Sequence, residues 1–230
     1  MCGRFTLTVH GIEDVAEALQ AELGESLRHA YRPHYNIAPG ADHWIVHDET
    51  GQRLLVPARW GLINRWCKDP RVGYRQINAR AETLAERPAF RQAFAHRRCV
   101  VPADGFYEWH GARGAREVFW FHAPDRAVLA LAGLYERWTD PKTRQSLLTF
   151  TIVTTAANRV VAEVHDRMPA LLEPGEIHAW LGGDRARELL RPAAEGRIVA
   201  TPASGRVGSP ANDGPECLVA DEPSGQLKLL

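Results

Sequence analysis

Residues 97–110 read RRCVVPADGFYEWH, and this stretch decides the predicted fold. A β-branched run is followed by Pro102, Asp104 and Gly105, which are typical of a turn, and then by an aromatic run. The order predicts two extended segments joined by a tight turn. Glu108 stands between two aromatic residues of the second segment, so we expect partial desolvation to raise the pKa of its carboxyl toward neutrality. A solvent-facing glutamate on an edge strand is the alternative.

Further extended runs flank this stretch. Alternating or β-branched residues predict strands at 3–9, 43–48, 52–63, 117–123, 127–138 and 147–155. Helical spacing or composition predicts helices at 12–23, 156–165, 175–181, 184–190 and within 82–97, where Pro88 is expected to begin a second helix. RPHYNIAPG predicts a loop at 32–40. Because strands dominate without regular βαβ alternation, the chain is predicted to be α+β. We expect a single domain over residues 1–230, a mostly antiparallel curled sheet or barrel-like core with surrounding helices, and a peripheral tail after about residue 218.

Length and composition indicate a globular protein. The 230 residues are enough for a large core, and 45% hydrophobic with 24% charged residues is ordinary for this class. No apolar run could span a bilayer and MCGRFTLTVHG lacks a signal-peptide pattern, so we expect a cytoplasmic protein, and a monomer. The four cysteines show no CxxC pair or zinc-ligand spacing, so no metal site and no other cofactor is expected.

The formal net charge of zero hides an uneven distribution. Residues 59–98 contain ten Lys or Arg and three Asp or Glu, whereas the rest of the chain contains eighteen basic and twenty-five acidic residues. Within this basic segment, Trp60 and Trp66 stand beside Arg59 and Arg65. Aromatic rings can stack on nucleobases while arginines contact phosphates, so the segment is a candidate for binding single-stranded nucleic acid. A solvated surface with a core tryptophan is the alternative.

Cys2 follows the initiator methionine, and this position gives it a special chemistry. Methionine aminopeptidases generally remove Met1 when the second residue is small. The product carries an α-amine and a thiol with unperturbed pKa values near ~8 and ~8.5, so both are partly reactive at neutral pH. The amine can condense with an aldehyde to a Schiff base, and the thiol can then close a five-membered thiazolidine ring. Cys2 is therefore a candidate nucleophile, unless it is merely the second residue of the chain.

Two further segments offer polar side chains for such a site. In HDRMP, residues 165–169, His165 lies at the junction of a helical segment and an expected strand, where an imidazole can act as acid or base. In QINARAET, residues 76–83, Asn78 and Arg80 share one face of an extended segment and offer groups for an amine and a phosphate. Taken singly, each has a structural role as its simpler explanation.

Together these segments resemble the SRAP family (SOS-response-associated peptidases), the sensors of abasic sites in single-stranded DNA. The resemblance covers nearly the whole chain, and its motifs occur in the family's order. They are MCGRF (1–5), YNIAPG (35–40), RWGLI (59–63), INARAET (77–83), RRCVVPADGFYEW (97–109), TTAAN (154–158), HDRMPALL (165–172) and a looser closing motif, VGSPANDGPECL (207–218). One departure is Asn64, where family members commonly have a proline, and it leaves the shape of the Trp60–Trp66 segment open.

The resemblance implies an enzyme of the DNA damage response. It implies an autopeptidase that loses Met1, then bonds through Cys2 to an abasic site as a thiazolidine DNA–protein crosslink, with possible lyase activity at abasic sites. Asn78 is then expected to position the Cys2 amine. Glu108 and His165 are expected to move protons during Schiff-base formation and sugar ring opening.

The resemblance also implies a DNA partner. The expected partner is single-stranded DNA containing abasic sites, which would associate the protein with the nucleoid while it is bound. The residues that fall where family motifs contact or kink the strand are Arg4, Asn36, Pro39, Trp60, Trp66, Arg80, Thr154 and Arg167.

Two other functions use the same residues. An N-terminal-nucleophile amidohydrolase would direct the Cys2 sulfur at an amide, and the basic segment would then have no role. A passive single-strand binding protein would use only the basic segment and form no covalent product. A metalloenzyme is disfavoured, because no His, Cys and Asp residues have convincing ligand spacing.

Overall fold

The computed structural model describes residues 2–112 and 116–221. Its strands are β1 (Phe5–Leu7), β2 (Glu22–Leu23), β3 (His34–Ile37), β4 (Asp42–Glu49), β5 (Gln52–Trp60), β6 (Asn78–Arg80), β7 (Arg98–Ala103), β8 (Gly105–His110), β9 (Glu117–His122), β10 (Leu129–Thr139), β11 (Ser146–Ala156), β12 (Arg167–Pro169), β13 (Leu171–Leu172) and β14 (Val199–Ala203). Its α-helices are α1 (Ile12–Ala18), α2 (Arg91–His96), α3 (Arg159–Ala162) and α4 (Ile177–Gly182). Short 3-10 helices lie at Glu25–Ala30, Pro70–Arg75, Pro174–Glu176, Ala186–Leu189, Gly205–Gly208 and Pro215–Leu218.

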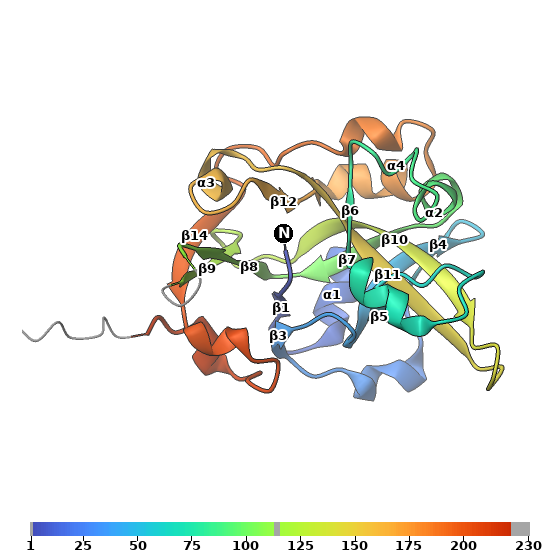
Figure 1. The fold of residues 1–230 in the computed structure, drawn as a ribbon, viewed down its shortest axis with the longest axis horizontal. Coiled ribbons are helices and arrows are strands. Elements are labelled where there is room, and N and C mark those ends of the chain that lie inside the picture. Colours follow the sequence, from blue (N-terminus) through green and yellow to red (C-terminus); the bar gives the residue numbers. More distant parts are fainter. Residues whose placement is uncertain (1, 113–115, 222–230) are drawn as a thin grey trace, which may run out of the picture.

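The strands form two sheets (Figure 1). In one sheet the order is β14-β9-β8-β1-β3, and every neighbouring pair is antiparallel. In the other, β11-β10-β7-β4-β5 are successive antiparallel neighbours, and β5 returns to pair in parallel with β11, through Thr149 with Arg59 and Phe150 with Trp60. This last pairing closes a five-strand barrel. The predicted α+β fold with a mostly antiparallel, barrel-like core is therefore confirmed.

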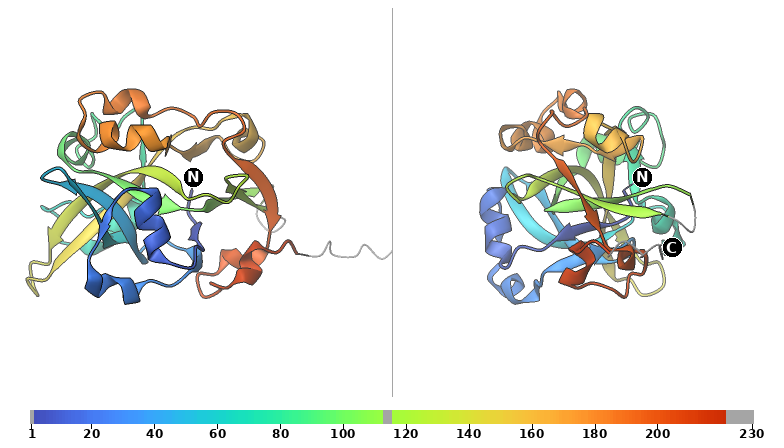
Figure 2. Two further views of the ribbon diagram at one scale, coloured as in Figure 1. Left: turned by 180° about the vertical axis from the view of Figure 1, so that it is seen from behind. Right: turned by 90° about the vertical axis from the view of Figure 1, so that its left-hand side faces the viewer.

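Helices cover the outside of the strands. Helix α1 buries Ile12, Val15 and Ala16 against them and lies on the face turned toward the viewer in the left panel of Figure 2. Helices α2 and α4 pack near β7, where the Trp180 indole donates a hydrogen bond to the Cys99 carbonyl. Among the described residues, no helix combines the length and apolar character that crossing a membrane would require.

Several predicted element boundaries were wrong. The helix predicted at 12–23 ends at Ala18, because the chain turns through Gln20 at a φ of 50° and continues into β2. The helix predicted at 82–97 is restricted to α2, and turns occupy the residues around Pro88. The loop predicted at 32–40 contains β3, which exists because β1 pairs with it. Short strands of this kind are stabilised by distant partners, so local pattern does not report them.

The turn predicted in residues 97–110 joins β7 to β8 and holds β1 in register. The buried Asp104 carboxylate accepts hydrogen bonds from the Thr6 hydroxyl and from both the backbone amide and the hydroxyl of Thr8, each at 2.5 Å. Gly105 is needed beside it, because a Cβ there would lie 2.1 Å from the Trp120 indole nitrogen. That nitrogen donates to the Thr6 hydroxyl at 3.1 Å. Asp104 and its neighbours therefore fix β1 against β8.

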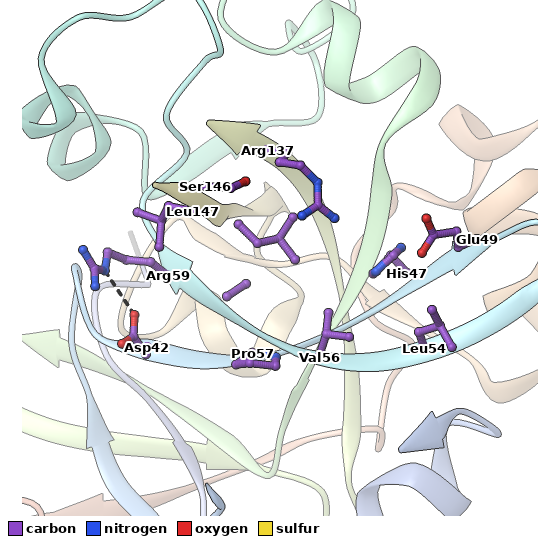
Figure 3. Close-up of a pocket in the computed structure, with 12 residues that line it drawn as sticks. Asp42, His47, Glu49, Leu54, Val56, Pro57, Arg59, Arg137, Ser146 and Leu147 are labelled. Atoms are coloured by element: carbon purple, nitrogen blue, oxygen red, sulfur yellow. Dashed lines mark hydrogen bonds and ion pairs between the residues drawn. The ribbon is translucent and has the colours of Figure 1, made fainter. Parts of the chain in front are cut away.

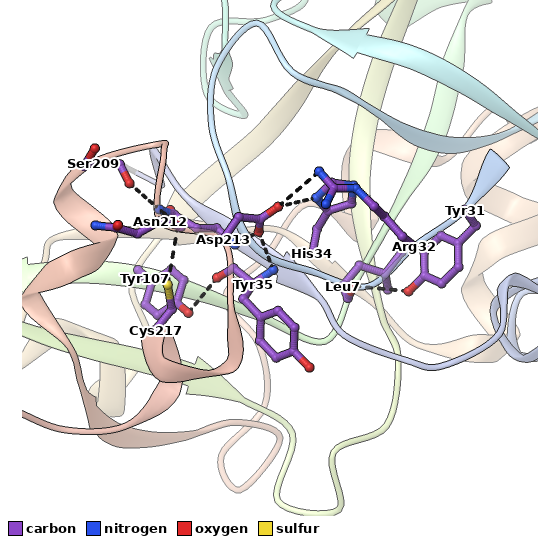
Figure 4. Close-up of polar contacts among 11 residues, drawn as sticks. Leu7, Tyr31, Arg32, His34, Tyr35, Tyr107, Ser209, Asn212, Asp213 and Cys217 are labelled. Carbon is purple, nitrogen blue, oxygen red and sulfur yellow. Dashed lines mark hydrogen bonds and ion pairs between the residues drawn. The ribbon is translucent and has the colours of Figure 1, made fainter.

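The segment near the C-terminus is also anchored by a carboxylate (Figure 4). Asp213 accepts from the backbone amides of Tyr35 and Asn36 at 2.7 and 2.9 Å and lies 2.6 Å from His34 Nδ1. Asp221 accepts from Ser204 and Gly205, so the start of the tail predicted to be peripheral is tied to the fold. Residues 222–230 of that tail lie outside the described residues.

We predict that Asp104→Asn destabilises the protein by about 2–3 kcal/mol, because an amide in this place loses charge-assisted bonds and turns a donor toward the Thr8 amide. For a chain of this size the midpoint of thermal unfolding should fall by roughly 4–12 °C, measured by calorimetry or circular dichroism. Asp125→Asn is the control, since Asp125 is exposed and accepts a single turn bond from Ala127. Equal midpoints for the two variants would refute the anchoring role.

Candidate active site

Cys2 lies at the centre of the candidate site, and the β1–β8 register places it there. Phe5 pairs with Phe106, and the Tyr107 amide donates to the Arg4 carbonyl at 3.0 Å. The same register, continued backward, brings the start of the chain alongside Glu108. Cys2 is fully buried, and burial raises the pKa of its thiol well above the ordinary value, with a further rise from the negative charge of Glu108. The thiol is therefore protonated at neutral pH.

Asn78, the first residue of β6, holds Cys2 from another strand. Its Nδ2 donates to the Cys2 carbonyl at 2.7 Å, and since a carbonyl can only accept, this bond fixes the orientation of the amide. Its Oδ1 is buried and has no hydrogen-bond partner among the described residues. An unsatisfied buried acceptor is costly, so this atom is ready for a donor. β6 is held here by parallel pairing with β11, through Asn78 and Ile152.

Glu108 is 2% exposed, and burial raises the pKa of its carboxyl to about 7, with a smaller rise from the charge of Asp166. The predicted rise in its pKa is confirmed, but the predicted cause was incomplete. Residues adjacent in a strand point to opposite faces, so the side chains of Tyr107 and Trp109 lie on the other side of β8. The Tyr107 hydroxyl donates to the Tyr35 carbonyl there. Glu108 is desolvated by tertiary packing.

His165 precedes β12 and approaches the same region. Its Nδ1 accepts from the Arg167 backbone amide at 2.9 Å and lies 3.1 Å from Asp166 Oδ1. The Arg167 amide can only donate, so its bond to Nδ1 favours the neutral tautomer with the proton on Nε2, whereas the Asp166 carboxylate beside the same nitrogen favours a proton on Nδ1. Burial lowers the pKa of His165 below its ordinary value. The charge of Asp166, the next residue, acts on the Glu108 carboxyl, which places the His165 segment on the side of that carboxyl.

The three arginines assigned to DNA differ in their surroundings. Arg80 is exposed at the end of β6. Arg4 is half-buried, where it donates to the Gly3 carbonyl, and burial lowers the pKa of its guanidinium. Arg167 is only 12% exposed and is bound in a two-bond ion pair by Glu82. Sequence reasoning missed Glu82, although it lies in the INARAET motif only two residues after Arg80.

Three of the residues assigned to DNA, Trp60, Thr154 and Asn36, are buried in this structure. Trp60 is 1% exposed, donates to the Ile77 carbonyl at 2.9 Å and packs edge-on against Phe5, so it belongs to the core. Thr154 is fully buried within β11. Asn36 donates to three backbone carbonyls of the closing segment, those of Val207, Ser209 and Asn212, and so fastens that segment to β3.

Trp66 remains available to a ligand, with 57% of its surface exposed, and Pro39 is partly exposed. Asn64, which replaces the proline usual in the family, is buried and donates to the Ala89 carbonyl at 2.7 Å. The Asn64 carbonyl also accepts from the Cys67 amide, closing a turn that presents Trp66. Asn64 therefore anchors this segment through both its side chain and its backbone carbonyl.

A cavity of about 470 Å3 lies elsewhere, between β4, β5 and β11 (Figure 3). It is lined by Asp42, His47, Arg59 and Arg137 among others, and it contains none of the residues gathered around Cys2. Within the described ranges, no group of three or more His, Cys, Asp or Glu side chains is arranged to hold a metal ion.

Comparison with known proteins gives consistent relatives. The family model described as SOS response associated peptidase (SRAP) matches residues 1–210. The chain is 37% identical over 225 residues to the abasic site processing protein YoqW of Bacillus subtilis, covering 95% of this chain and 99% of that one. It is 32% identical to the abasic site processing protein HMCES of Gallus gallus, covering 84% of this chain and 67% of that protein. A solved structure of a protein from Bacteroides thetaiotaomicron, 24% identical, has the same fold, with a TM-score of 0.83 over 96% of this chain and all of that one. The chain belongs to the SRAP family.

Proposed function

We propose that this protein processes abasic sites in single-stranded DNA, by bonding Cys2 covalently to the aldehyde of the damaged sugar. Two relatives named abasic site processing protein support the substrate class. The reaction requires the free α-amine of Cys2, so removal of Met1 is the activating step. We include in the proposal that the protein removes Met1 itself and that the Schiff base can lead to strand cleavage.

The observation that carries the proposal is the buried, unsatisfied Oδ1 of Asn78 beside Cys2. Its Nδ2 already holds the Cys2 carbonyl, so the opposite end of the same amide can accept from an amine on Cys2. Glu108 acts electrostatically on the Cys2 thiol, which brings a carboxyl with a pKa of about 7 to the same place. An amine, a thiol, an amide acceptor and a titrating acid are the groups that aldehyde capture needs.

The reaction balances without an oxidant or a metal. The Cys2 amine attacks C1′ of the ring-opened sugar, and one proton of the amine passes to the carbonyl oxygen. That oxygen leaves as water with the second amine proton, and a carbon–nitrogen double bond forms. The thiol adds to the same carbon, and its proton passes to the nitrogen. An aldehyde and an aminothiol thus become a thiazolidine and one water molecule.

Glu108 is suited to both proton transfers because its two protonation states are comparably populated near neutral pH. The acid form can protonate the departing hydroxyl. The carboxylate can then take the proton of the Cys2 thiol, which burial keeps from ionising unaided. His165, in the Nε2–H tautomer that the Arg167 amide favours, can serve the sugar side, where ring opening also moves a proton.

We predict that Cys2→Ala forms no heat-stable adduct with a single-stranded oligonucleotide containing an abasic site, because an amine without a thiol stops at a reversible Schiff base. Non-covalent affinity should change little. Denaturing gels and intact mass measure the adduct and the loss of Met1 together. Cys67→Ala, which removes another free thiol, should crosslink normally. A heat-stable adduct formed by Cys2→Ala would disprove the mechanism.

We predict that Glu108→Gln slows crosslinking about 100-fold, since general acid–base groups typically contribute at least that much. The pH dependence should also change. With a pKa of about 7, the acid form of Glu108 is lost as pH rises through 7, so the wild-type rate should decline on the alkaline side, and this decline should vanish in the variant. Glu117→Gln, at an exposed position of β9, is the control. An unchanged rate and profile would remove Glu108 from the reaction.

We predict that Trp66→Ala weakens binding to intact single-stranded DNA by about fivefold or more, because stacking on one base is worth about 1–3 kcal/mol. Fluorescence anisotropy at low and physiological salt measures it, and wild-type affinity should fall steeply with salt. Val219→Ala removes an exposed apolar side chain outside the basic segment and should have no effect. Equal wild-type affinity for duplex DNA, or a neutral Trp66→Ala, would exclude this contact.

A further inference from the structure

Arg167 forms a bridge between two segments of the candidate site. Its Nη1 and Nη2 donate to the two carboxylate oxygens of Glu82 at 2.6 and 2.9 Å, and Nη2 also donates to the Thr154 carbonyl at 2.7 Å. The guanidinium is thus held on two sides, by a side chain and by the backbone of β11. The Arg167 side chain is 12% exposed, whereas Glu82 is 53% exposed.

The two segments joined in this way each carry a residue of the proposed chemistry. Glu82 lies two residues beyond β6, whose first residue is Asn78. Arg167 begins β12, and its backbone amide donates to Nδ1 of His165. Both strands pair with β11 at Thr154, which is opposite Arg80 on one side and Pro169 on the other. The Glu82–Arg167 pair therefore ties β6 to β12 across the strand that they share.

The pair differs from an ordinary surface ion pair, which contributes little. Its geometry is a two-bond fork between a guanidinium and a carboxylate, which fixes orientation as well as distance. The Thr154 carbonyl that receives Nη2 also accepts the Ala81 amide at 2.9 Å, so the bridge is attached to the β6 segment at two points. The Arg167 hydrogen bonds hold the pKa of Glu82 below its ordinary value, so the carboxylate stays charged.

We propose that Glu82 is a positioning residue for His165. It fixes the Arg167 guanidinium, which holds the start of β12, and with it the backbone amide that orients the imidazole. The inference rests on the proposed function, because His165 is taken to move protons in aldehyde capture. No contact between Glu82 and the DNA or Cys2 is needed for it to act.

Two consequences separate this role from a role in DNA binding. Without the Glu82 charge, the region around Arg80 and Arg167 becomes more positive, so affinity for single-stranded DNA should not fall. Loosening of β12 should instead disturb the His165 ring, and misplacement of a reacting group by about 1 Å can cost up to 10²-fold in rate. Rate and affinity should therefore respond differently to the same substitution.

The test is single-turnover crosslinking to a single-stranded oligonucleotide with one abasic site, using chains whose intact mass confirms the loss of Met1. For Glu82→Gln we expect the rate constant at saturating DNA to fall about tenfold or more, with the half-saturating concentration within about twofold of wild type or lower. Glu188→Gln is the matched control, because Glu188 forms an equally forked but remote and exposed pair with Arg185. It should behave as wild type.

Two further measurements keep the result interpretable. Arg167→Lys should slow the reaction, and combining it with Glu82→Gln should add little, because both changes break one bridge. Nitrogen NMR of the His165 imidazole should show the Nε2–H tautomer in wild type and a loss of that preference in Glu82→Gln, whether or not Met1 has been removed.

Several results would overturn the positioning role of Glu82. A Glu82→Gln rate within about twofold of wild type, additive effects in the double variant, or an unaltered His165 tautomer would overturn the positioning role. A variant that changed only the half-saturating concentration would assign Glu82 to DNA binding and overturn it as well. If wild-type protein formed no adduct, the proposed function itself would fail, and the tautomer measurement would still decide whether Glu82 orients His165.

Discussion

The hydrogen bonds that Asp104 accepts from Thr6 and Thr8 are the constraint on which the candidate site depends. They hold β1 beside β8 in one register, and a shift of one residue would turn every side chain of β1 to the opposite face. Cys2 lies only three residues before β1, so this register decides whether it faces Glu108. A flexible chain terminus is thereby converted into a fixed reactive group, since termini are mobile unless tied down.

Burial shifts the pKa values of the groups around Cys2 in different directions. It raises the pKa of both the Cys2 thiol and the Glu108 carboxyl, so the thiol holds its proton while the carboxyl titrates near neutrality. It lowers the pKa of His165, which keeps the imidazole neutral. A site with these properties favours reaction through the amine first, followed by a thiol addition that needs a base. The proposed order of steps follows from desolvation, the largest contribution to each shift.

Strand β11 joins the barrel to two short strands of the candidate site, β6 and β12. It closes the barrel by pairing with β5. It also pairs with β6, which carries Asn78, and with β12, which begins just after His165. Thr154 lies at the point where β6 and β12 meet it, and this accounts for its burial in a motif that resemblance alone assigned to DNA. Thr154 therefore lies where the strands on either side of the candidate site are held together.

The sequence by itself determined the fold class, the turn at Asp104 and Gly105 and the family, because each depends on local pattern or on motifs in order. The rise in the Glu108 pKa was predicted, but the burial that causes it is a property of the tertiary structure. Short strands such as β2 and β3 escaped it, because their stability comes from partners far along the chain. Sequence also assigned Trp60, Asn36 and Thr154 to the DNA surface. Only the tertiary structure could show that they are buried and that Glu82 holds Arg167, because exposure and pairing are properties of packed neighbours and not of residue type.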